Sequence, residues 1–593
     1  MMRVADYIVE RLHGVGVRHI YMVTGRGLLF LSDAVAKRTA MRGISMHHEQ
    51  AAAYAAVAEA QHGGRLGACM VSTGCAATNA MTGVLNAWQD GVPCIFISGQ
   101  NPLRETVRHT GLPLRTFGSQ ETDVVPLVAS ITKYAVMIED PAQIAYEMDK
   151  ALHLAQSGWK GPVWIDVPLD VQNMRVEPEA LVRWSCEERR ARPSDEDMRH
   201  VRECLARAER PVVLIGAGVR AAGAIPELRA FLDECPLPLA FANSAVDTLG
   251  SGDPLSMGAV GSLGGSRAGN FAVQNADLLL VVGCRLSPMT TGSEYAKFAR
   301  AAQIIVVDID GAEHAKQTVK IDRLIRADAK EFLLALAQSP ACPASEAWLA
   351  KCRHWKSVFP KCETWSRTAG KIDLYYLAES LSAVMPEDAI LLTDAGLEEL
   401  IVPSAIDFKP GQRCIHPASQ GSMGFALPAA VGAHLSSGKS VIVVVGDGSI
   451  MMNLQELQTI RQYNVPAKLI VVNNNAYAII RKRQVELFRN RTIGTDPSNG
   501  VSCPAFDKVA DCFGLPYVRI EESSDLPRKM RELLERPGPV LCEVIGFENQ
   551  DYLANSHALN AARRYVRRPL EDQAPFLERS RFLSEMIVDP IDQ

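Results

Sequence analysis

The sequence predicts an α/β protein made of three doubly wound domains with parallel sheets. In three stretches of the 593-residue chain, short apolar runs typical of buried strands alternate with segments of helical apolar spacing. The length also suits three or four domains of ordinary size. We place the domains at residues 1–170, 200–335 and 371–550, with linkers at 171–199 and 336–370 and a tail at 551–593.

The strand predictions follow the apolar runs in chain order. They are residues 19–23, 68–71, 94–97 and 163–167 in the first domain, 211–215, 277–282 and 303–307 in the second, and 441–445 and 468–472 in the third. Between the last two runs, residues 450–463 have helical spacing and are followed by Asn464 and Pro466, which are stop signals. Strand, helix and strand at this length form a βαβ crossover, so the two strands run parallel.

The bulk composition excludes several classes of protein. Charged residues make up 22% of the chain and the net charge is −5, which gives no reason to expect nucleic acid or an acidic membrane surface as partner. No apolar run approaches the ~20 residues of a membrane span, and the N-terminus lacks the apolar core of a signal peptide. The fourteen cysteines include no Cys-x-x-Cys pair, so we expect reduced thiols and a cytoplasmic protein.

Polar residues follow both strands of the predicted crossover. Gly446-Asp447-Gly448-Ser449 comes after the first strand, and Asn474 lies within the three asparagines after the second. Because parallel strands end at the same edge of a sheet, we expect Asp447 and Asn474 to lie together. A carboxylate and an amide oxygen suit magnesium, and glycines let a phosphate approach the backbone. The alternative is a pair of tight turns, which this spacing across a crossover disfavours.

Three further motifs accompany this one along the chain. They are His47-His48-Glu49-Gln50 before an Ala-rich segment, Ser72-Thr73-Gly74-Cys75-Ala76-Ala77-Thr78-Asn79 with Phe96-Ile97-Ser98-Gly99-Gln100, and Ser419-Gln420-Gly421-Ser422-Met423-Gly424-Phe425. Together with the paired strand ends, they resemble acetohydroxyacid synthase and related thiamine diphosphate enzymes, over nearly the whole chain. Taken alone, Glu49 also suits a helix N-terminus, where the helix dipole favours a carboxylate.

The resemblance implies a thiamine diphosphate-binding fold in the first and third domains and assigns roles to their residues. Glu49 contacts a ring nitrogen of the cofactor, Met423 is the apolar wedge that bends it, and Gln120 lies near the reacting carbon. Asp447 and Asn474 are side-chain ligands of Mg²⁺, with the backbone carbonyl of Ala476. The remaining cofactor-binding candidates are Thr73, Asn79, Gly421, Gly446, Gly448 and Ser449.

The second domain resembles the flavin- or nucleotide-binding middle domain of the same family. A glycine-rich turn follows its first strand, and a second motif follows the strand at 277–282. The resemblance implies FAD here, while relatives that lack flavin or bind ADP in this fold leave the alternative open. The candidate residues are Gly216, Ala217, Gly218, Arg220, Gly283, Arg285, Asp308 and Asp328.

Several positions depart from the family pattern. Met289 stands where the family has an arginine that grips the acceptor's carboxylate, and Arg483 stands where it has a tryptophan that selects 2-oxobutyrate. Arg481, Lys482 and Arg483 could therefore meet a phosphorylated acceptor, or form a solvated helix face. Residues 396–399, Gly-Leu-Glu-Glu, replace a segment that often offers Gln and His to the diphosphate. The tail is more like that of family members in polysaccharide and nucleotide-sugar pathways.

We therefore expect a thiamine diphosphate- and Mg²⁺-dependent carboligase, which decarboxylates a 2-oxo acid, with pyruvate as the favoured donor. The acceptor is a second carbonyl compound, for which a nucleotide-linked ketosugar is the more specific hypothesis. Acetolactate synthase proper, a simple 2-oxo acid decarboxylase or oxidase, and a non-catalytic nucleotide-binding homologue are the alternatives. The resemblance also implies a homodimer or homotetramer with sites at the subunit interface.

Overall fold

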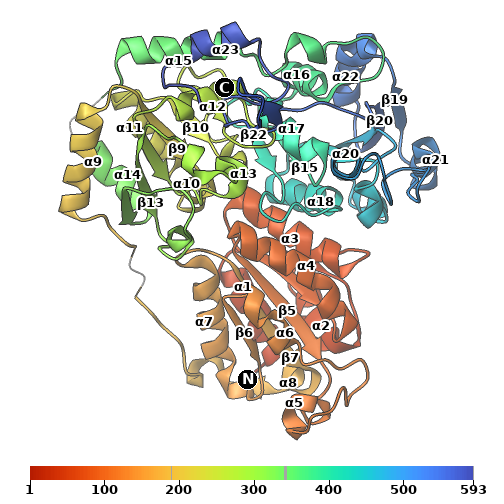
Figure 1. Ribbon diagram of the computed structural model, residues 1–593. Coiled ribbons are helices and arrows are strands. Elements are labelled where there is room, and N and C mark those ends of the chain that lie inside the picture. The colour runs from red at the N-terminus through yellow and green to blue at the C-terminus, as the bar shows by residue number, and fades with distance from the viewer. Residues whose placement is uncertain (188–189, 339–342, 592–593) are drawn as a thin grey trace.

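The computed structural model describes residues 1–187, 190–338 and 343–591. It contains three six-stranded sheets, and every strand pair within them is parallel. Helices cover both faces of each sheet, so the predicted fold class is confirmed (Figure 1). Within these ranges no helix is long and apolar enough to cross a bilayer.

The first domain is built on a sheet with strand order β3-β2-β4-β5-β7-β6. Helices α1, α2, α7 and α8 pack on one face, and α3, α4 and α6 pack on the other. The strands are β2 (His19–Met22), β3 (Arg42–Ser45), β4 (Gly67–Val71), β5 (Cys94–Gln100), β6 (Tyr134–Met137) and β7 (Pro162–Pro168). The helices are α1 (Val4–Gly14), α2 (Leu29–Lys37), α3 (Glu49–Gly63), α4 (Cys75–Asp90), α6 (Val124–Val128), α7 (Ile144–Gln156) and α8 (Leu169–Asn173).

The third domain repeats this plan with strand order β16-β15-β17-β18-β20-β19. Its strands are β15 (Ile390–Thr393), β16 (Arg413–Ile415), β17 (Val441–Gly446), β18 (Ala467–Asn473), β19 (Tyr517–Ile520) and β20 (Val540–Ile545). Helices α16 (Leu374–Val384), α17 (Leu397–Ala405) and α22 (Leu526–Glu535) pack on one face, and α18 (Ala426–Ser437) and α21 (Phe506–Cys512) on the other. The predicted helix at 450–463 is a short 3₁₀ turn, Ile450–Asn453, followed by α19 (Glu456–Gln462).

The first and third domains share one apolar core, because α3 packs directly against α18. Alanines fill α3, and a Cβ on Gly432 of α18 would lie 2.1 Å from the carbonyl oxygen of Ala55. Strand residues from both sheets join this core, including Phe96 and Val443. The two sheets are thus held together by a pair of closely packed helices (Figure 1).

The middle domain has strand order β11-β10-β9-β12-β13-β14. Its strands are β9 (Pro211–Ile215), β10 (Leu239–Phe241), β11 (Ser256–Ala259), β12 (Leu278–Val282), β13 (Gln303–Asp308) and β14 (Arg323–Arg326). Its helices include α9 (Asp195–Arg207), α10 (Ala217–Ala221), α11 (Ile225–Glu234), α12 (Arg267–Gln274), α13 (Pro288–Thr291) and α14 (Ala329–Ala337). Helix α15 (Glu346–Val358) lies within the predicted linker 336–370, and its Trp348 and Trp355 belong to the core of this domain.

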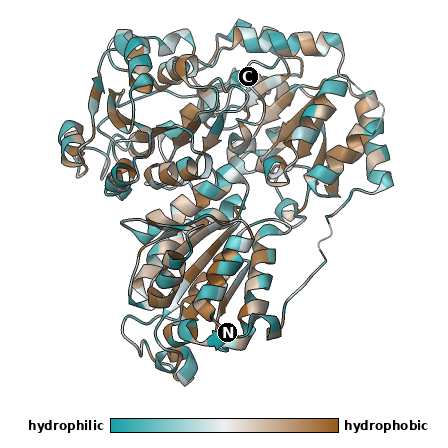
Figure 2. Ribbon diagram, turned by 180° about the vertical axis from the view of Figure 1, so that it is seen from behind, coloured by the Kyte–Doolittle hydropathy of each residue, from teal (hydrophilic) through white to brown (hydrophobic). Residues whose placement is uncertain are grey.

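The predicted tail forms a structured connection between the middle and third domains (Figure 1). Leu553 accepts a hydrogen bond from Gly264 of the middle domain, and its N–H donates to the hydroxyl of Tyr375 on α16. Gln573 is buried and bonds to Gly261, Asn270 and Asn555. The tail also holds the hairpin β21 (His557–Leu559) and β22 (Tyr565–Arg567) and helix α23 (Arg579–Glu585). The strands at the centre of each domain are mainly hydrophobic (brown), and hydrophilic residues (teal) are found on the helices that cover them (Figure 2).

Candidate active site

The predicted strand ends lie side by side at the carboxyl edge of the third sheet. Gly446 at the end of β17 pairs with Val472 near the end of β18. The N–H of Asp447 donates to the carbonyl of Val472 at 3.0 Å, and the N–H of Asn475 donates to Oδ2 of Asp447 at 2.6 Å. The crossover therefore brings Asp447 and the asparagine loop into direct contact, as its spacing predicts.

The oxygen donors at this edge suit a magnesium ion. Asp447 and Asn474 are 2% and 6% exposed, and Ala476 is also buried. Burial raises the pKa of Asp447 to about 6, against the effect of four backbone N–H groups that favour its charged form. No group of three or more His, Cys, Asp or Glu residues with metal-binding geometry exists in the described ranges. The proposed ligands do not form such a group, because only Asp447 is acidic and the others are the amide oxygen of Asn474 and the carbonyl oxygen of Ala476. Mg²⁺ binds oxygen ligands of these kinds in proteins.

Ser449 fixes the loop that carries Met423. Its hydroxyl donates to Oδ1 of Asp394 at 2.6 Å and accepts the N–H of Gly424 at 3.0 Å. Gly424 has φ +79°, and a Cβ there would lie 2.6 Å from the side chain of Met452. The backbone next to the half-buried Met423 is therefore held by these contacts, and the role of Met423 as a wedge stays a prediction. Gly421, with φ +57°, is exposed at the start of the same loop.

Asp394 is a residue of this site that the sequence reasoning missed. It is fully buried directly after β15, accepts from Ser449, and also accepts the N–H of Ala426 at 3.1 Å. Burial raises its pKa to about 7. The sequence pattern that identified Asp447, an acidic residue and a glycine directly after an apolar strand, is also present at Asp394 and could have identified it.

Glu49 begins helix α3, and Asn79 holds its carboxylate. The Nδ2 of Asn79 donates to Oε2 of Glu49 at 2.9 Å. The neighbouring Gln50 accepts from Asn453 at 3.0 Å, and Asn453 also donates to the carbonyl of Gly424 at 2.8 Å. Two hydrogen bonds thus connect the start of α3 to the loop of Met423. In the single chain Glu49 is half-buried and Asn79 is exposed.

Gln120 has a strained backbone beside Gly74. Its φ is +61°, in the left-handed region that non-glycine residues seldom occupy, and such strain gathers at functional sites. A Cβ on Gly74 would lie 1.9 Å from the carbonyl oxygen of Gln120, so only glycine fits there. The Gln120 side chain is exposed, whereas Thr73 is buried and donates to Oε1 of Gln100 at 2.7 Å.

The glycine-rich turn of the middle domain packs against the end of its neighbouring strand. The N–H of Gly218 donates to the carbonyl of Gly283 at 3.0 Å. A Cβ on Gly216 or Gly218 would lie within 2.8 Å of the backbone of Gly283 or Cys284. Close backbone approach within the protein therefore accounts for these glycines, with Ala217 between them at the start of α10.

The charged FAD candidates also have partners within the chain. Arg220 donates to the buried Asp247 at 2.8 Å, and Arg285 reaches Glu313 at 3.2 Å and Ser419 at 3.1 Å. Asp308 accepts the N–H of Asp310, and Asp328 caps α14 through the N–H groups of Lys330 and Glu331. These contacts neither require nor test a flavin, so FAD stays a prediction.

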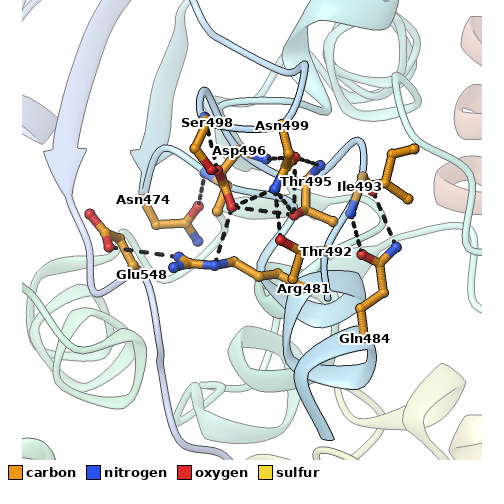
Figure 3. A network of polar contacts seen from close by, with 11 residues as sticks. Asn474, Arg481, Gln484, Thr492, Ile493, Thr495, Asp496, Ser498, Asn499 and Glu548 are labelled. Atoms are coloured by element: carbon orange, nitrogen blue, oxygen red, sulfur yellow. Dashed lines mark hydrogen bonds and ion pairs between the residues drawn. The ribbon is translucent and has the colours of Figure 1, made fainter. Parts of the chain in front are cut away.

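The basic residues near the site face carboxylates (Figure 3). Arg481 on α20 (Ala478–Leu487) lies between Asp496 at 3.3 Å and Glu548 at 3.7 Å. Lys482 pairs with Asp551 at 3.1 Å and Arg483 with Glu486 at 3.4 Å. A phosphorylated acceptor would therefore have to compete with these carboxylates for each cation.

Met289 lies on α13, next to the tail. It is 40% exposed, and its carbonyl accepts the N–H of Ser262 at 2.7 Å. Ser262 in turn accepts the N–H of Asn555 at 2.9 Å. Asp551 pairs with Lys482 on α20, the helix that also carries Arg483. Residues 551–555 of the tail therefore connect α20 to Ser262, which bonds to Met289 on α13.

Comparison with known proteins agrees with this arrangement. Three family models match the chain, described as Thiamine pyrophosphate enzyme, N-terminal TPP binding domain (residues 2–123), central domain (198–336) and C-terminal TPP binding domain (394–544). The acetolactate synthase isozyme 1 large subunit of Escherichia coli (strain K12) is 31% identical over 91% of this chain and 93% of its own length. Acetolactate synthase 1 of Zea mays, chloroplastic, is 31% identical over 91% of this chain and 85% of its own length.

The acetolactate synthase large subunit of Parasynechococcus marenigrum (strain WH8102) is 32% identical over 91% of this chain and 87% of its own length. Each matched model falls on a different one of the three domains, and the relatives extend across the domains together. The chain belongs to the thiamine pyrophosphate enzyme family, as an acetolactate synthase-like carboligase.

Proposed function

We propose that this carboligase takes a two-carbon unit from pyruvate and transfers it to a nucleotide-linked ketosugar. The observation that carries the acceptor proposal is Met289, which stands where the family resemblance expects a carboxylate-binding arginine. An acceptor without a carboxylate needs no such clamp, whose loss removes about 1.5–3 kcal/mol of charge-assisted binding from a 2-oxo acid.

Some residues of the site would bind the metal and the cofactor, and Glu49 would take part in proton transfer. Asp447, Asn474 and the carbonyl of Ala476 would hold Mg²⁺ and, through it, the diphosphate. Glu49, oriented by Asn79, would share a proton with the ring nitrogen. When bound, thiamine diphosphate supplies the carbon nucleophile and electron sink for decarboxylation. Met423 would set the cofactor's bend, and Gln120 would contact the reacting groups.

Acetolactate synthase proper is the second candidate, and the relatives at 31% identity favour it. In that case the acceptor is a second 2-oxo acid, and a residue other than Met289 binds its carboxylate. Simple decarboxylation or oxidation of the 2-oxo acid differs from both candidates in forming no carbon–carbon bond. FAD in the middle domain is part of the proposal, and its visible absorption in the purified protein is the test.

We also propose that the enzyme works as a homodimer or homotetramer in the cytoplasm. Glu49 is half-buried and Gln120 and Asn79 are exposed in the single chain, whereas proton transfer to a cofactor needs a dry pocket. A second subunit covering this face would supply that pocket. The cytoplasmic assignment rests on the described cysteines, all of which are free thiols.

The test is product analysis with isotope-labelled pyruvate and a panel of acceptors, read by mass spectrometry. We expect a ketosugar extended by two labelled carbons, at a rate within the ordinary range of ~1–1000 per second. Acetolactate formed at such a rate with no ketosugar product would instead identify acetolactate synthase proper. Free acetaldehyde or acetate as the main product would identify the decarboxylase or oxidase.

A further inference from the structure

We propose that the hairpin β21–β22 of the tail binds the nucleoside diphosphate part of the acceptor. This inference rests on the proposed function, in which the acceptor is a nucleotide-linked ketosugar, and it adds the place where the nucleotide is held. The candidate residues for thiamine diphosphate and FAD all lie outside residues 552–570, the segment that contains the hairpin.

The hairpin segment is strongly basic. Residues 552–570 contain four arginines and no aspartate or glutamate. Arg568 is buried and pairs with an acid of the tail at 3.6 Å. The other three, Arg563, Arg564 and Arg567, form no ion pair with any acid that the structure describes. Unlike the cations of α20, which face carboxylates, these arginines can meet an anion without displacing an acid.

Arg567 lies at the base of the hairpin, against the middle domain. Its Nη1 donates to Oγ of Ser293 at 2.6 Å, and its carbonyl accepts from Nζ of Lys297 at 2.8 Å. These residues line a small pocket, in which Glu294 pairs with Lys297 at 2.9 Å. The Nε of Arg567 is buried and has no hydrogen-bond partner among the described residues. Because a buried donor without a partner is unfavourable, this guanidinium suits an acceptor oxygen from outside the chain.

The face of the hairpin that carries Arg567 also carries two stacked rings. His557 lies directly across from Arg567, and Tyr565 precedes Arg567 by two residues, so all three side chains project from one face. The rings of His557 and Tyr565 have centroids 5.5 Å apart and planes 7° apart. Tyr565 is 72% exposed, and Leu559, directly across from it, is 60% exposed. Exposed aromatic rings stack nucleobases, and arginines beside them bind the phosphates.

The hairpin is attached to the segment that carries Met289. Ser293, the partner of Arg567, follows Met289 by four residues, which span at most about 14 Å. Arg567 and Tyr565 are separated by one two-residue step of a strand, about 7 Å. Met289, Arg567 and Tyr565 therefore follow one another in the order in which ketosugar, diphosphate and base are joined in the acceptor.

Asn560 closes the tip of the hairpin and holds Arg563 and Arg564. Its N–H donates to the carbonyl of Arg564 at 2.9 Å. Its carbonyl and its Oδ1 accept the N–H groups of Arg563 and Arg564, each at 2.8 Å. Both arginines are exposed, so their charge attracts an anion from solution, and salt screens this attraction. We therefore expect nucleotide binding to weaken as the ionic strength rises.

The experiment uses the full-length protein saturated with thiamine diphosphate and Mg²⁺, so that a diphosphate probe does not occupy the cofactor site. Calorimetry measures the binding of UDP, CDP, ADP and GDP. Arg567→Gln removes the phosphate contact, and Tyr565→Ala removes the stacking surface. Tyr565→Phe keeps the ring. Arg65→Gln is the matched control, because it removes an exposed arginine of the first domain.

We expect at least one of these nucleoside diphosphates to bind, and Arg567→Gln and Tyr565→Ala to raise its Kd about tenfold. Tyr565→Phe and Arg65→Gln should bind it like the wild type. The two hairpin variants that lose the nucleotide should also raise the KM for the ketosugar identified by product analysis and leave the KM for pyruvate unchanged. Because Tyr565 is exposed, Tyr565→Ala should keep the melting temperature of the wild type.

The outcomes separate this inference from the proposed function. If none of the probes binds to the wild type, or if Arg567→Gln and Tyr565→Ala bind them equally well, the inference is overturned. Ketosugar extension with the same KM in the wild type and both variants overturns the inference and leaves the proposed function standing. Acetolactate as the only product, with nucleotide binding that depends on the hairpin, overturns the proposed function and supports a nucleoside diphosphate site on the hairpin.

Discussion

At the scale of single residues, a few side-chain hydrogen bonds position the residues of the candidate active site. The amide of Asn79 holds the Glu49 carboxylate, and the hydroxyl of Ser449 links Asp394 to the loop of Met423. Sequence reasoning found Glu49, Asn79 and Ser449 as cofactor-binding candidates. It could not give Asn79 and Ser449 their positions as hydrogen-bond partners within the chain, because those contacts join segments far apart in sequence.

Replacing Glu49 with glutamine should abolish most of the activity and leave the fold intact. The amide keeps the shape of the side chain but cannot share a proton with a ring nitrogen, a loss of about 10²–10⁴-fold in rate. Because Glu49 is half-buried, we expect an unchanged melting temperature and circular dichroism spectrum. Asn79→Ala should lower the rate less, since it removes only the orienting hydrogen bond. Full activity of Glu49→Gln would show that Glu49 does not share the proton with the cofactor.

Met289→Arg should move acceptor preference toward 2-oxo acids. Met289 is 40% exposed, so the longer side chain fits without repacking the core. A restored carboxylate contact of about 1.5–3 kcal/mol corresponds to a roughly 10- to 100-fold lower KM for a 2-oxo acid acceptor. Met174→Arg is the control, at a methionine of similar exposure, 42%, in the first domain. Equal acceptor profiles for the wild type and Met289→Arg would place the acceptor elsewhere.

At the scale of elements, the strands predicted from long apolar runs lie inside the sheets, whereas the interior strands β10, β15 and β20 and the edge strands were not among the predictions. Strands β17 and β18 are apolar runs because both of their faces are covered, and such runs are recognisable in the sequence. Strand β14 carries two arginines in four residues, and β16 is a three-residue strand that begins with Arg413. Both lie at a sheet edge, where polar side chains are tolerated and the apolar signal disappears.

The packing of α3 on α18 has a pH-dependent component at His62. Its Nδ1 lies 3.0 Å from the hydroxyl of Ser436 on α18, and its carbonyl accepts from Arg413. Burial, then the charge of Arg413, lowers its pKa to about 4. The folded chain thus favours neutral His62. Its contribution to stability is present above the ordinary pKa of 6.5 and is lost as the pH falls toward 4.

Compared with His62→Gln, whose side chain stays neutral, the wild type should lose about 1–3 kcal/mol of stability between about pH 7 and pH 4. Denaturant midpoints measured for both proteins across this range are the check. Parallel curves would show that His62 is protonated in the folded protein without cost.

At the scale of the whole molecule, the sequence predicts the number of domains but not how their three sheets pack together. The repeated alternation of strand and helix predicts three domains, yet the contact of α3 with α18 depends on glycines and alanines that have no long-range signature. The tail was predicted as a charged segment outside the three domains, more like that of family members in polysaccharide and nucleotide-sugar pathways. Its buried Gln573 shows that it is part of the folded middle domain.

If the site is shared between subunits, inactive variants should complement one another. In the single chain the start of α3 meets the loop of Met423, so a mixed dimer of Glu49→Gln and Asp447→Asn has no intact site if each chain uses its own pair of residues. If each site instead combines Glu49 of one subunit with Asp447 of the other, the same mixed dimer contains one intact site. Random exchange of subunits should restore about a quarter of wild-type activity, measured after co-refolding or co-expression of differently tagged chains. Chains that are fully active as monomers, or mixtures that stay inactive despite proven exchange, would contradict the shared site.

The position of the tail has a consequence for how such enzymes diversify. Residues 551–555 run between the elements of Met289 and Arg483, while Glu49, Asp394 and Asp447 come from other parts of the chain. Under the proposed function, the residues that would select the acceptor therefore border the tail, whereas Glu49, Asp394 and Asp447 lie in segments outside it. Exchange of the C-terminal segment between relatives would then be expected to change the acceptor and to leave the cofactor site in place.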